Sequence, residues 1–280
     1  MNTADLHMHT AASDGSDTVP ELLEKLTDSG ITTFSVTDHD TVDGALEMEQ
    51  IVPTSFRYIR GIEFSCVSPC GKCHILGYGY DPASPDFQDT LACGRTLRAA
   101  KLACRLRALD EKFGIRLTAE ELAWLHAQKS PGKPHIAQLL AARGMFPDIN
   151  TAIRDAVNYC RAPNSRIPAE QAVSAILAAG GIPVWAHPLG GEGEPLLSEN
   201  DFAVQLSCLR SFGIRGLECF YSRYTQEQTR FLQEHAGRNG LAVSGGSDYH
   251  GKNKAGIFPG KLNASCEPVP EDQITLLTLL

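Results

Sequence analysis

The segment Ala4-Asp5-Leu6-His7-Met8-His9-Thr10 stands near the start of the 280-residue chain and places a His-x-His motif at the end of a short predicted strand. Side chains two residues apart on an extended chain point the same way, so one metal ion can bind both imidazoles. Imidazole and carboxylate ligands together are typical of Zn, Mn or Fe(II). The segment therefore predicts a strand that delivers metal ligands at its carboxyl end, as the strands of an α/β barrel do.

Histidines elsewhere in the chain occupy the same kind of position. Six of the nine histidines lie at or close to the end of a predicted strand: His7, His9, His39, His74, His187 and His250. The carboxylates that accompany them are Asp14, Asp38, Glu63, Glu218 and Asp248. One buried histidine is more often structural than a ligand, but packing alone does not account for this set. The set predicts a polynuclear metal centre at the mouth of a barrel.

Most of the chain alternates between strand and helix patterns. A first helix is predicted from Val19, after a Thr18/Glu21 capping box, to a stop at Gly30. Further strands are predicted at 32–37, 182–186, 216–221 and 242–244, and further helices at 42–51, 169–179, 201–212 and 226–239. The segments 58–66 and 73–80 flank a Pro-Cys-Gly turn and predict a hairpin. This alternation predicts an α/β fold with a parallel sheet or barrel.

Residues 87–161 have a different composition, in which leucine, alanine and arginine dominate and no strand is predicted. Between Gly94 and Arg116 this segment contains seven basic residues: Arg95, Arg98, Lys101, Arg105, Arg107, Lys112 and Arg116. One helical stripe contains Arg95, Arg98, Lys101 or Leu102, and Arg105. This stripe is either a solvated helix face or a positive wall facing an anionic substrate. We expect a barrel formed by 1–86 and 162–280, and a helical insertion at 87–161 that serves as a substrate cap.

The overall composition excludes several classes of protein. A net charge of −8 and an estimated pI of 5.6 argue against dedicated binding of duplex nucleic acid. An N-terminus without a basic flank or apolar segment predicts no signal peptide, and no apolar run is long enough to predict a membrane span. The nine cysteines are too few for a disulfide scaffold, so we expect a cytoplasmic protein with free thiols.

The complete set of motifs resembles the PHP (polymerase and histidinol phosphatase) superfamily. The matching segments are Asp5-Leu6-His7-Met8-His9-Thr10, Ser13-Asp14-Gly15, Thr37-Asp38-His39-Asp40, Gly61-Ile62-Glu63, His74-Ile75-Leu76-Gly77-Tyr78, Ala186-His187-Pro188 and Gly246-Ser247-Asp248-Tyr249-His250. A single His-x-His motif is weak evidence, whereas this ordered set is highly specific. The resemblance implies a distorted (β/α)7 TIM-like barrel with two or three divalent metal ions, for which Mn, Fe or Zn is expected and Mg is possible.

The resemblance also implies which side chains hold each metal. The first metal would be held by His7, His9, Glu63 and Asp248; Glu63 would bridge to a second held with His74 and His187; and Asp14, His39 and His250 would hold a third. Among these ligands the expected catalytic set is His7, His9, Glu63, His187 and Asp248. Asp14 stands where some members of the superfamily have histidine, and a carboxylate there still suits a borderline or hard metal.

The implied activity is hydrolysis of phosphate esters by a hydroxide that bridges two metals. A helical insertion containing Gly132-Lys133-Pro134-His135-Ile136-Ala137 is similar to the nucleotide-directed branch of the superfamily. The expected substrates are small: a nucleoside monophosphate, a 3′,5′-bisphosphonucleotide or the 5′ end of a short RNA. The alternatives are a histidinol-phosphate phosphatase and, from a different class, a non-catalytic metal-binding module. The oligomeric state is not predicted.

Five residues are predicted to contact the substrate: Lys133, His135, Arg98, Arg143 and Glu218. Pro134 suits the first position of a helix, so His135 would lie at a helix N-terminus, where exposed N–H groups favour phosphate. Helix capping or packing is the alternative for His135. Glu218 could instead orient a metal ligand.

Three cysteines near the predicted hairpin turn, Cys66, Cys70 and Cys73, are spaced like ligands of an iron–sulfur cluster. No other feature of a radical enzyme accompanies them, so we interpret them as structural or incidental thiols. The glycine-rich segments at 190–193 and 240–246 are not followed by Lys-Ser/Thr, which argues against a P-loop nucleotide-binding site.

Overall fold

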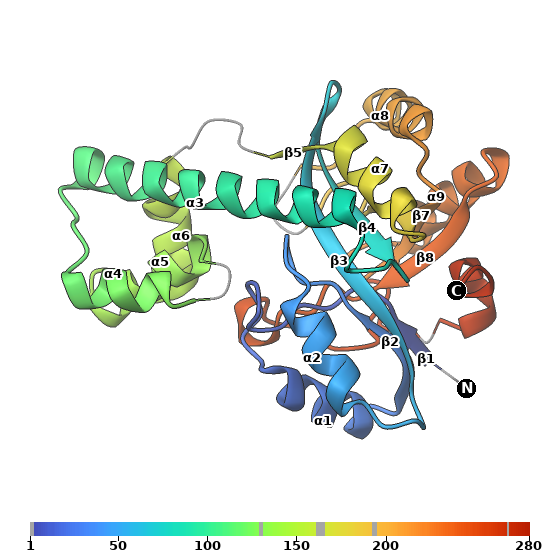
Figure 1. The fold of residues 1–280 in the computed structure, drawn as a ribbon, viewed down its shortest axis with the longest axis horizontal. Coiled ribbons are helices and arrows are strands. Elements are labelled where there is room, and N and C mark those ends of the chain that lie inside the picture. The colour runs from blue at the N-terminus through green and yellow to red at the C-terminus, as the bar shows by residue number, and fades with distance from the viewer. Residues whose placement is uncertain (1–2, 129–130, 161–165, 192–194, 268) are drawn as a thin grey trace.

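A curved sheet forms the centre of the computed structural model, which describes residues 3–128, 131–160, 166–191, 195–267 and 269–280 (Figure 1). Its strands are β1 (Thr3–Asp5), β2 (Ile31–Val36), β3 (Arg57–Ser68), β4 (Gly71–Tyr78), β5 (Ile167–Pro168), β6 (Ile182–Ala186), β7 (Gly216–Tyr221) and β8 (Ala242–Gly246). Their order is β1-β2-β3-β4-β6-β7-β8, and β5 pairs separately with β3. All these pairings are parallel except those of β4, which runs antiparallel to both β3 and β6.

The two ends of the sheet meet, so that the sheet forms a nearly closed barrel. The backbone N–H of Leu6 donates to the carbonyl of Gly245 at 3.1 Å, and that of Asp248 donates to the carbonyl of His7 at 2.8 Å. Met8 pairs with Tyr249 in a parallel bridge. The predicted distorted barrel is therefore confirmed, and the reversed direction of β4 is its principal distortion.

Helices cover the outside of the barrel because each buries one apolar face against the sheet. They are α1 (Val19–Asp28), α2 (Asp43–Ile51), α7 (Ala169–Ala178), α8 (Glu199–Phe212) and α9 (Gln226–Arg238). In α1 the predicted capping box forms between Thr18 and Glu21, and the helix buries Val19, Leu22 and Leu26. Short 3-10 helices, η2 (Gly251–Asn253), η3 (Glu271–Gln273) and η4 (Thr275–Thr278), complete the C-terminal region.

A helical arm extends from the barrel between β4 and β5. Its elements are α3 (Pro85–Phe113), α4 (Ala119–His126), α5 (Lys133–Ala142), α6 (Ile149–Asp155) and η1 (Val157–Tyr159). The first half of α3 joins the barrel core through Phe87 and Leu91, and its second half joins a separate apolar cluster through Leu102 and Leu109. Figure 1 shows α3 reaching from the barrel to the group formed by α4, α5 and α6. The long helix thus holds the arm beside one end of the barrel.

The structure differs from the sequence prediction mainly in short elements. The two-residue strand β5, which pairs with Cys66 and Val67 of β3, was not predicted, because a two-residue segment containing Pro168 shows no periodicity. The expected boundary of the insertion at 161–162 lies outside the described residues. Among the described helices, none combines the length and the apolar character needed to cross a lipid bilayer.

Closure of the barrel predicts that Gly246 tolerates no side chain. A Cβ added to Gly246 would lie 2.6 Å from the backbone nitrogen of His7, which follows the neighbouring strand β1. We expect Gly246→Ala to lower the free energy of unfolding by about 1–3 kcal/mol, measured by urea denaturation in EDTA. The control is Gly237→Ala within α9, where an added Cβ meets no atom within 4 Å, and it should be neutral or slightly stabilising. Equal unfolding midpoints for the two variants would contradict the predicted contact.

Candidate metal centre

The nine predicted metal ligands lie together at one edge of the barrel, because each follows or belongs to a neighbouring strand. His7 and His9 follow β1, His39 follows β2, and Glu63 lies within β3. On the other side of the hairpin, His74 lies on β4, while His187 follows β6 and both Asp248 and His250 follow β8. Asp14 comes from the loop between β1 and α1. Ligands separated by more than 200 residues in the chain therefore meet in one site.

The first group of ligands surrounds the two histidines of the opening motif. The Nε2 atoms of His7 and His9 lie 3.1 Å apart. Glu63 Oε2 lies 3.2 Å from the first and 3.1 Å from the second, and Asp248 Oδ1 lies 3.6 and 3.4 Å from them. The ligand atoms of His7, His9 and Glu63 lie within 4.8 Å of one another and could hold one metal ion.

Glu63 is also shared with the neighbouring ligands. Its Oε1 lies 2.8 Å from His74 Nδ1 and 3.2 Å from His187 Nε2. Its Oε2 lies 3.1 Å from His39 Nδ1, and His39, Glu63 and His74 form a second group able to hold a metal. The position of this carboxylate between two ligand groups suits a bridging role.

A third group lies toward the loop that carries Asp14. Asp14 Oδ1 lies 3.3 Å from His250 Nε2 and 3.6 Å from His9 Nδ1, and Asp14 Oδ2 lies 3.8 Å from His39 Nε2. The ligand atoms of these four residues lie within 4.8 Å of one another. None of the metal-competent groups found among the described residues contains a cysteine. Cys66 and Cys73 lie opposite each other across the hairpin as buried free thiols.

The arrangement of donor atoms fits divalent metals. The Nε2 atoms of His7 and His9 lie 3.1 Å apart, and the carboxylate of Glu63 lies beside both. The lone pairs of these three groups converge on one point, and a single proton shared between two imidazoles cannot bind all of them. In addition, the buried Nδ1 of His39 has no hydrogen-bond partner among the described residues, although it lies 3.1 Å from Glu63 Oε2. Buried polar atoms without partners are unfavourable unless an ion or water binds them. Nitrogen and oxygen donors in this combination suit Mn, Fe or Zn.

The charges of the site are strongly coupled. Burial alone would lower the pKa of His7, but the nearby carboxylates of Glu218 and Glu63 outweigh burial and raise that pKa well above its ordinary value. Burial likewise opposes ionisation of Glu63, yet His39 and His7 hold its pKa well below the usual range. Glu63 is therefore ionised, and its negative charge is balanced by cations, which are protonated imidazoles or bound metal ions.

A set of buried acids behind the ligands fixes their orientation. Glu218 Oε1 lies 2.8 Å from His7 Nδ1, and its Oε2 accepts the backbone N–H of His187 at 2.7 Å. Asp38 accepts the backbone N–H and the hydroxyl of Thr10, which shapes the loop after β1. Glu218 is completely buried and lies behind His7. This position favours the second of its two predicted roles, the orientation of a metal ligand, over direct contact with the substrate.

Unusual backbone conformations also mark the site. Of the four non-glycine residues with a positive φ in the described part of the chain, three lie at the site, namely Asp40, His187 and Asp248 with φ values of 55°, 30° and 58°, and the fourth is Cys266. Such conformations are unfavourable for side chains and persist where the surrounding structure enforces them, commonly at functional sites. His187 and Asp248 are predicted metal ligands, and Asp40 accepts a hydrogen bond from the backbone N–H of Ser65 on β3.

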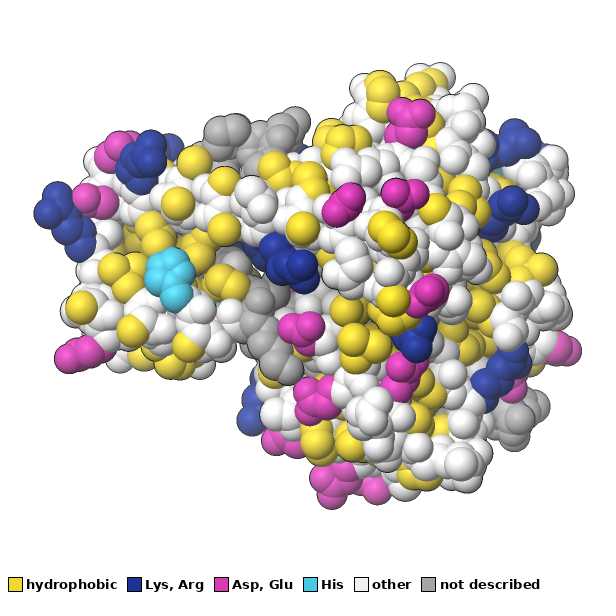
Figure 2. Space-filling model, in the orientation of Figure 1, with side chains coloured by type: hydrophobic (Ala, Val, Ile, Leu, Met, Phe, Trp, Pro, Cys, Tyr) yellow, Lys and Arg dark blue, Asp and Glu magenta, His cyan; other side chains and the backbone are white. Residues whose placement is uncertain are grey.

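A cleft of about 380 Å³ separates the metal-ligand cluster from the helical arm. On the barrel side it is lined by Asp14, His39, His74 and Lys254; on the arm side by Arg98, Lys101, Arg105 and Lys133; and Arg166 lies between the two. Figure 2 shows Lys and Arg side chains beside α3 where the arm meets the barrel. Three residues of the predicted basic stripe thus face the cleft, whereas Arg95 is exposed outside its lining.

Of the other residues predicted to contact the substrate, two line the cleft and two do not. Lys133 lines the cleft and donates to Asn158 Oδ1 at 2.6 Å. Arg98 also lines it and forms an ion pair with Asp40 at 2.5 Å. His135 Nδ1 accepts the backbone N–H of Gly132 at 3.1 Å, which caps α5, and the residue is outside the lining of the cleft. The structure does not bring Arg143 to the site, because its guanidinium is paired with Glu121.

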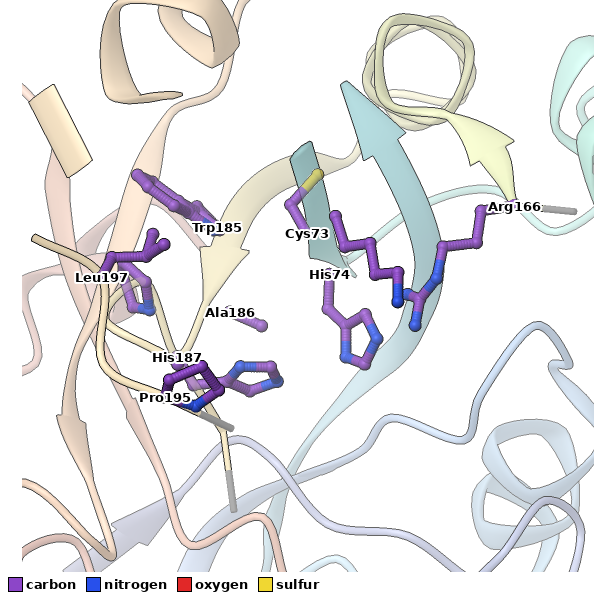
Figure 3. A pocket seen from close by; sticks show the side chains of 11 residues that line it. Cys73, His74, Arg166, Trp185, Ala186, His187, Pro195 and Leu197 are labelled. Carbon is purple, nitrogen blue, oxygen red and sulfur yellow. The ribbon is translucent and has the colours of Figure 1, made fainter. Parts of the chain in front are cut away.

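A second, smaller cavity of about 70 Å³ adjoins the cleft at His74. Figure 3 shows the imidazoles of His74 and His187 lying side by side, with the guanidinium of Arg166 near His74. The two rings have centroids 5.0 Å apart in an edge-to-face arrangement. Arg166 borders both cavities, and we did not predict it because it lies in a connecting segment without periodicity. Lys254 was not predicted either, although it lies only six residues after Asp248.

Comparison with known proteins identifies the same architecture in enzymes that act on phosphate esters. Residues 5–131 match the PHP domain. The chain is 27% identical to a 3′,5′-nucleoside bisphosphate phosphatase from Chromobacterium violaceum, with 96% of this chain and 95% of that protein covered. It is 31% identical to a phosphoribosyl 1,2-cyclic phosphate 1,2-diphosphodiesterase from Eggerthella lenta, with 89% and 94% covered.

A third relative is a 5′-3′ exoribonuclease from Haemophilus influenzae, which is 28% identical, with 88% of this chain and 89% of that protein covered. Among solved structures, a metal-dependent phosphoesterase from Bifidobacterium adolescentis superimposes with a TM-score of 0.78 at 28% identity. That match covers 95% of this chain and 94% of the other. The similarity therefore includes both the barrel and the helical arm.

The contact between Glu218 and His7 predicts that metal affinity depends on a residue that is not itself a ligand. We expect Glu218→Gln to weaken Mn²⁺ binding about 10–100-fold, because His7 loses the charged partner that directs its Nε2 toward the site. Calorimetric titration of the metal-free protein measures this affinity. Glu234→Gln, on the exposed side of α9, is the control and should bind Mn²⁺ as the wild type does. Unchanged affinity in Glu218→Gln would show that this contact does not support the centre.

Proposed function

The chain belongs to the PHP family and is a metal-dependent phosphoesterase, and we propose that its substrates are phosphate esters of nucleotides. The substrate would be a nucleoside monophosphate, a 3′,5′-bisphosphonucleotide or the 5′ end of a short RNA. The observation that carries this proposal is the cleft itself, which has a cluster of metal ligands on one wall and a group of cations on the other.

We assign the metal ligands as the sequence predicts: His7, His9, Asp14, His39, Glu63, His74, His187, Asp248 and His250. The converging donor atoms, the shared carboxylate of Glu63 and the unpartnered nitrogen of His39 support this assignment. Two or three ions of Mn, Fe, Zn or Mg would supply Lewis acidity and lower the pKa of coordinated water. Within this set, His7, His9, Glu63, His187 and Asp248 surround the place where a phosphoryl group would react, and Glu218 holds His7 in position.

The arm side of the cleft supports a substrate with more than one negative group. Burial, together with repulsion from Arg166 and Arg105, lowers the pKa of Lys101 to about 7. Burial and the neighbouring arginines likewise lower the pKa of Arg105 to about 10. Within the described part of the chain, the buried Nε atoms of Arg98 and Arg105 and the Nη1 atom of Arg166 have no hydrogen-bond partner. Cations that repel one another and retain unused donors favour an anionic ligand.

This basic surface occurs in a chain with a net charge of −8, so it is local to the cleft. One phosphate can contact the metals while a second phosphate, or the next phosphodiester of an oligonucleotide, contacts Lys101 and Arg105. The names of the three relatives, which act on a bisphosphonucleotide, a cyclic phosphate and RNA, support phosphate esters of this general kind. Histidinol phosphate carries an ammonium group in addition to its one phosphate, and the cations of the arm would repel that group, which nucleotides lack.

A phosphate-release screen in Mn²⁺ tests the proposed substrate class. We expect turnover of AMP, adenosine 3′,5′-bisphosphate or a 5′-phosphorylated oligoribonucleotide to exceed that of histidinol phosphate, because the cations that line the cleft repel the ammonium group that only histidinol phosphate carries. Glu63→Gln should lower turnover about 100-fold or more by removing the shared charge of the centre. Glu24→Gln, on the exposed face of α1, is the control. Preferential turnover of histidinol phosphate would refute the nucleotide proposal, and metal binding without any turnover would favour a non-catalytic module.

The cations of the arm predict discrimination between substrates with one and two phosphates. We expect Arg105→Gln to lower kcat/KM for adenosine 3′,5′-bisphosphate about 10–100-fold, the effect of losing a charge-assisted hydrogen bond. For a substrate with a single phosphate the change should be less than about threefold, because that phosphate lies at the metals. Arg107→Gln, an exposed position on the same helix, should affect neither substrate. Equal losses for both substrates in Arg105→Gln would contradict a separate contact for the second phosphate.

A further inference from the structure

The two carboxylate oxygens of Asp248 face different surroundings. Oδ1 points to the imidazoles, at 3.6 Å from His7 Nε2 and 3.4 Å from His250 Nδ1. Oδ2 points away from them and accepts hydrogen bonds from the hydroxyl of Tyr221, at 3.0 Å, and from the ammonium of Lys254. Asp248 is therefore held by two donors whose surroundings can be compared.

Tyr221 and Lys254 differ in their access to the cleft. Tyr221 is 1% exposed, packs against the ring of His187 and is absent from the lining of the described cavities. Lys254 retains 23% of its side-chain exposure and lines the cleft together with Asp14, His39 and His74. The buried, neutral hydroxyl of Tyr221 is thus able to orient Asp248 by itself. Lys254, in contrast, places a positive charge in the cleft, where a substrate would lie.

The loop after β8 fixes this charge at the edge of the ligand cluster. The backbone N–H of Lys252 donates to Ser16 Oγ at 2.8 Å, and Asn253 Nδ2 donates to the carbonyl of Asp14 at 2.9 Å. Gly251 adopts a φ of +64° and packs closely on Ser16, which no larger side chain would allow. Lys254 follows directly after these anchors, so its position relative to Asp14 is set by the backbone.

A fixed ammonium beside a polynuclear cation site requires an explanation. Its charge repels the metals that Asp248 and Asp14 would bind, so holding a metal ligand in place does not account for a lysine where a neutral donor suffices. A phosphate ester in the cleft resolves this repulsion, because a phosphoryl group carries negative charge on its peripheral oxygens during transfer. Cationic side chains that contact those oxygens stabilise the transition state.

We propose that Lys254 is a catalytic residue whose ammonium contacts the peripheral phosphoryl oxygens of a phosphate ester bound at the metal centre. The inference uses the phosphoesterase activity and does not depend on the substrate being a nucleotide. Lys254 acts here as a charged hydrogen-bond donor, and Asp248 serves as its anchor.

The test compares Lys254→Met with Tyr221→Phe, since both remove a donor from Asp248 Oδ2. For each variant we measure the number of Mn²⁺ ions bound per chain and their affinity, the affinity of the Mn²⁺-loaded protein for inorganic phosphate, and kcat and KM on p-nitrophenyl phosphate. We expect Lys254→Met to keep its Mn²⁺ content, bind phosphate at least about tenfold more weakly and lose about 100-fold in kcat. Lys254→Arg should recover part of the phosphate affinity because it restores the charge.

Tyr221→Phe should show the opposite pattern. Its Mn²⁺ affinity should fall about tenfold, while phosphate affinity of the fully Mn²⁺-loaded protein should stay within about twofold of the wild type. Unchanged phosphate affinity in Lys254→Met overturns the proposal, and so does a loss of Mn²⁺ that matches Tyr221→Phe, because Lys254 would then only position Asp248. Inorganic phosphate and p-nitrophenyl phosphate contain no nucleoside, so these results can be read even if no nucleotide is hydrolysed.

Discussion

The buried carboxylate of Glu63 is the interaction on which the rest of the site depends. Five imidazoles, those of His7, His9, His39, His74 and His187, have a nitrogen within 3.2 Å of its two oxygens. A carboxylate offers about four positions for hydrogen-bond donors, so it cannot pair with five rings in good geometry. The Nε2 atoms of His7 and His9 also approach each other, to 3.1 Å. Cations placed between these atoms relieve both problems, which is why the arrangement is best understood as a metal centre.

The fold supplies this arrangement by distorting an otherwise parallel barrel. The antiparallel strand β4 places His74 across from Ser65 in the hairpin and beside Ala186, the residue before His187. Closure between β1 and β8 brings Asp248 to the histidines of the opening motif. The helical arm then faces this edge, so that one wall of the cleft carries metal ligands and the other carries cations. Opposite charges facing each other across a cleft suit a substrate that is an anion and reacts at a metal.

The sequence predicted the features that depend on pattern and failed for those that depend on contacts between distant side chains. Strand-end histidines such as His187 could be located because alternating apolar segments define where strands end. The sequence could not decide between the two roles considered for Glu218, because the choice depends on its contact with His7, which is distant in the chain. It did not indicate Lys254, because the position of that residue in the cleft depends on the fold. Arg143 was predicted to contact the substrate because it is a basic residue in the insertion. In the structure it pairs with Glu121 instead, a contact that the sequence pattern does not indicate. Strand β5 was not predicted because its two residues are too few to show an alternating pattern.

The central claim is that ligands from the whole length of the chain form one polynuclear centre around Glu63. Anomalous diffraction from crystals equilibrated with Mn²⁺ tests it most directly. The account predicts two or three anomalous peaks a few ångströms apart, each bordered by the imidazoles and carboxylates assigned above, with Glu63 between two of them. A metal-replete crystal with no anomalous peak among these side chains, or with the peaks located elsewhere in the molecule, would contradict it.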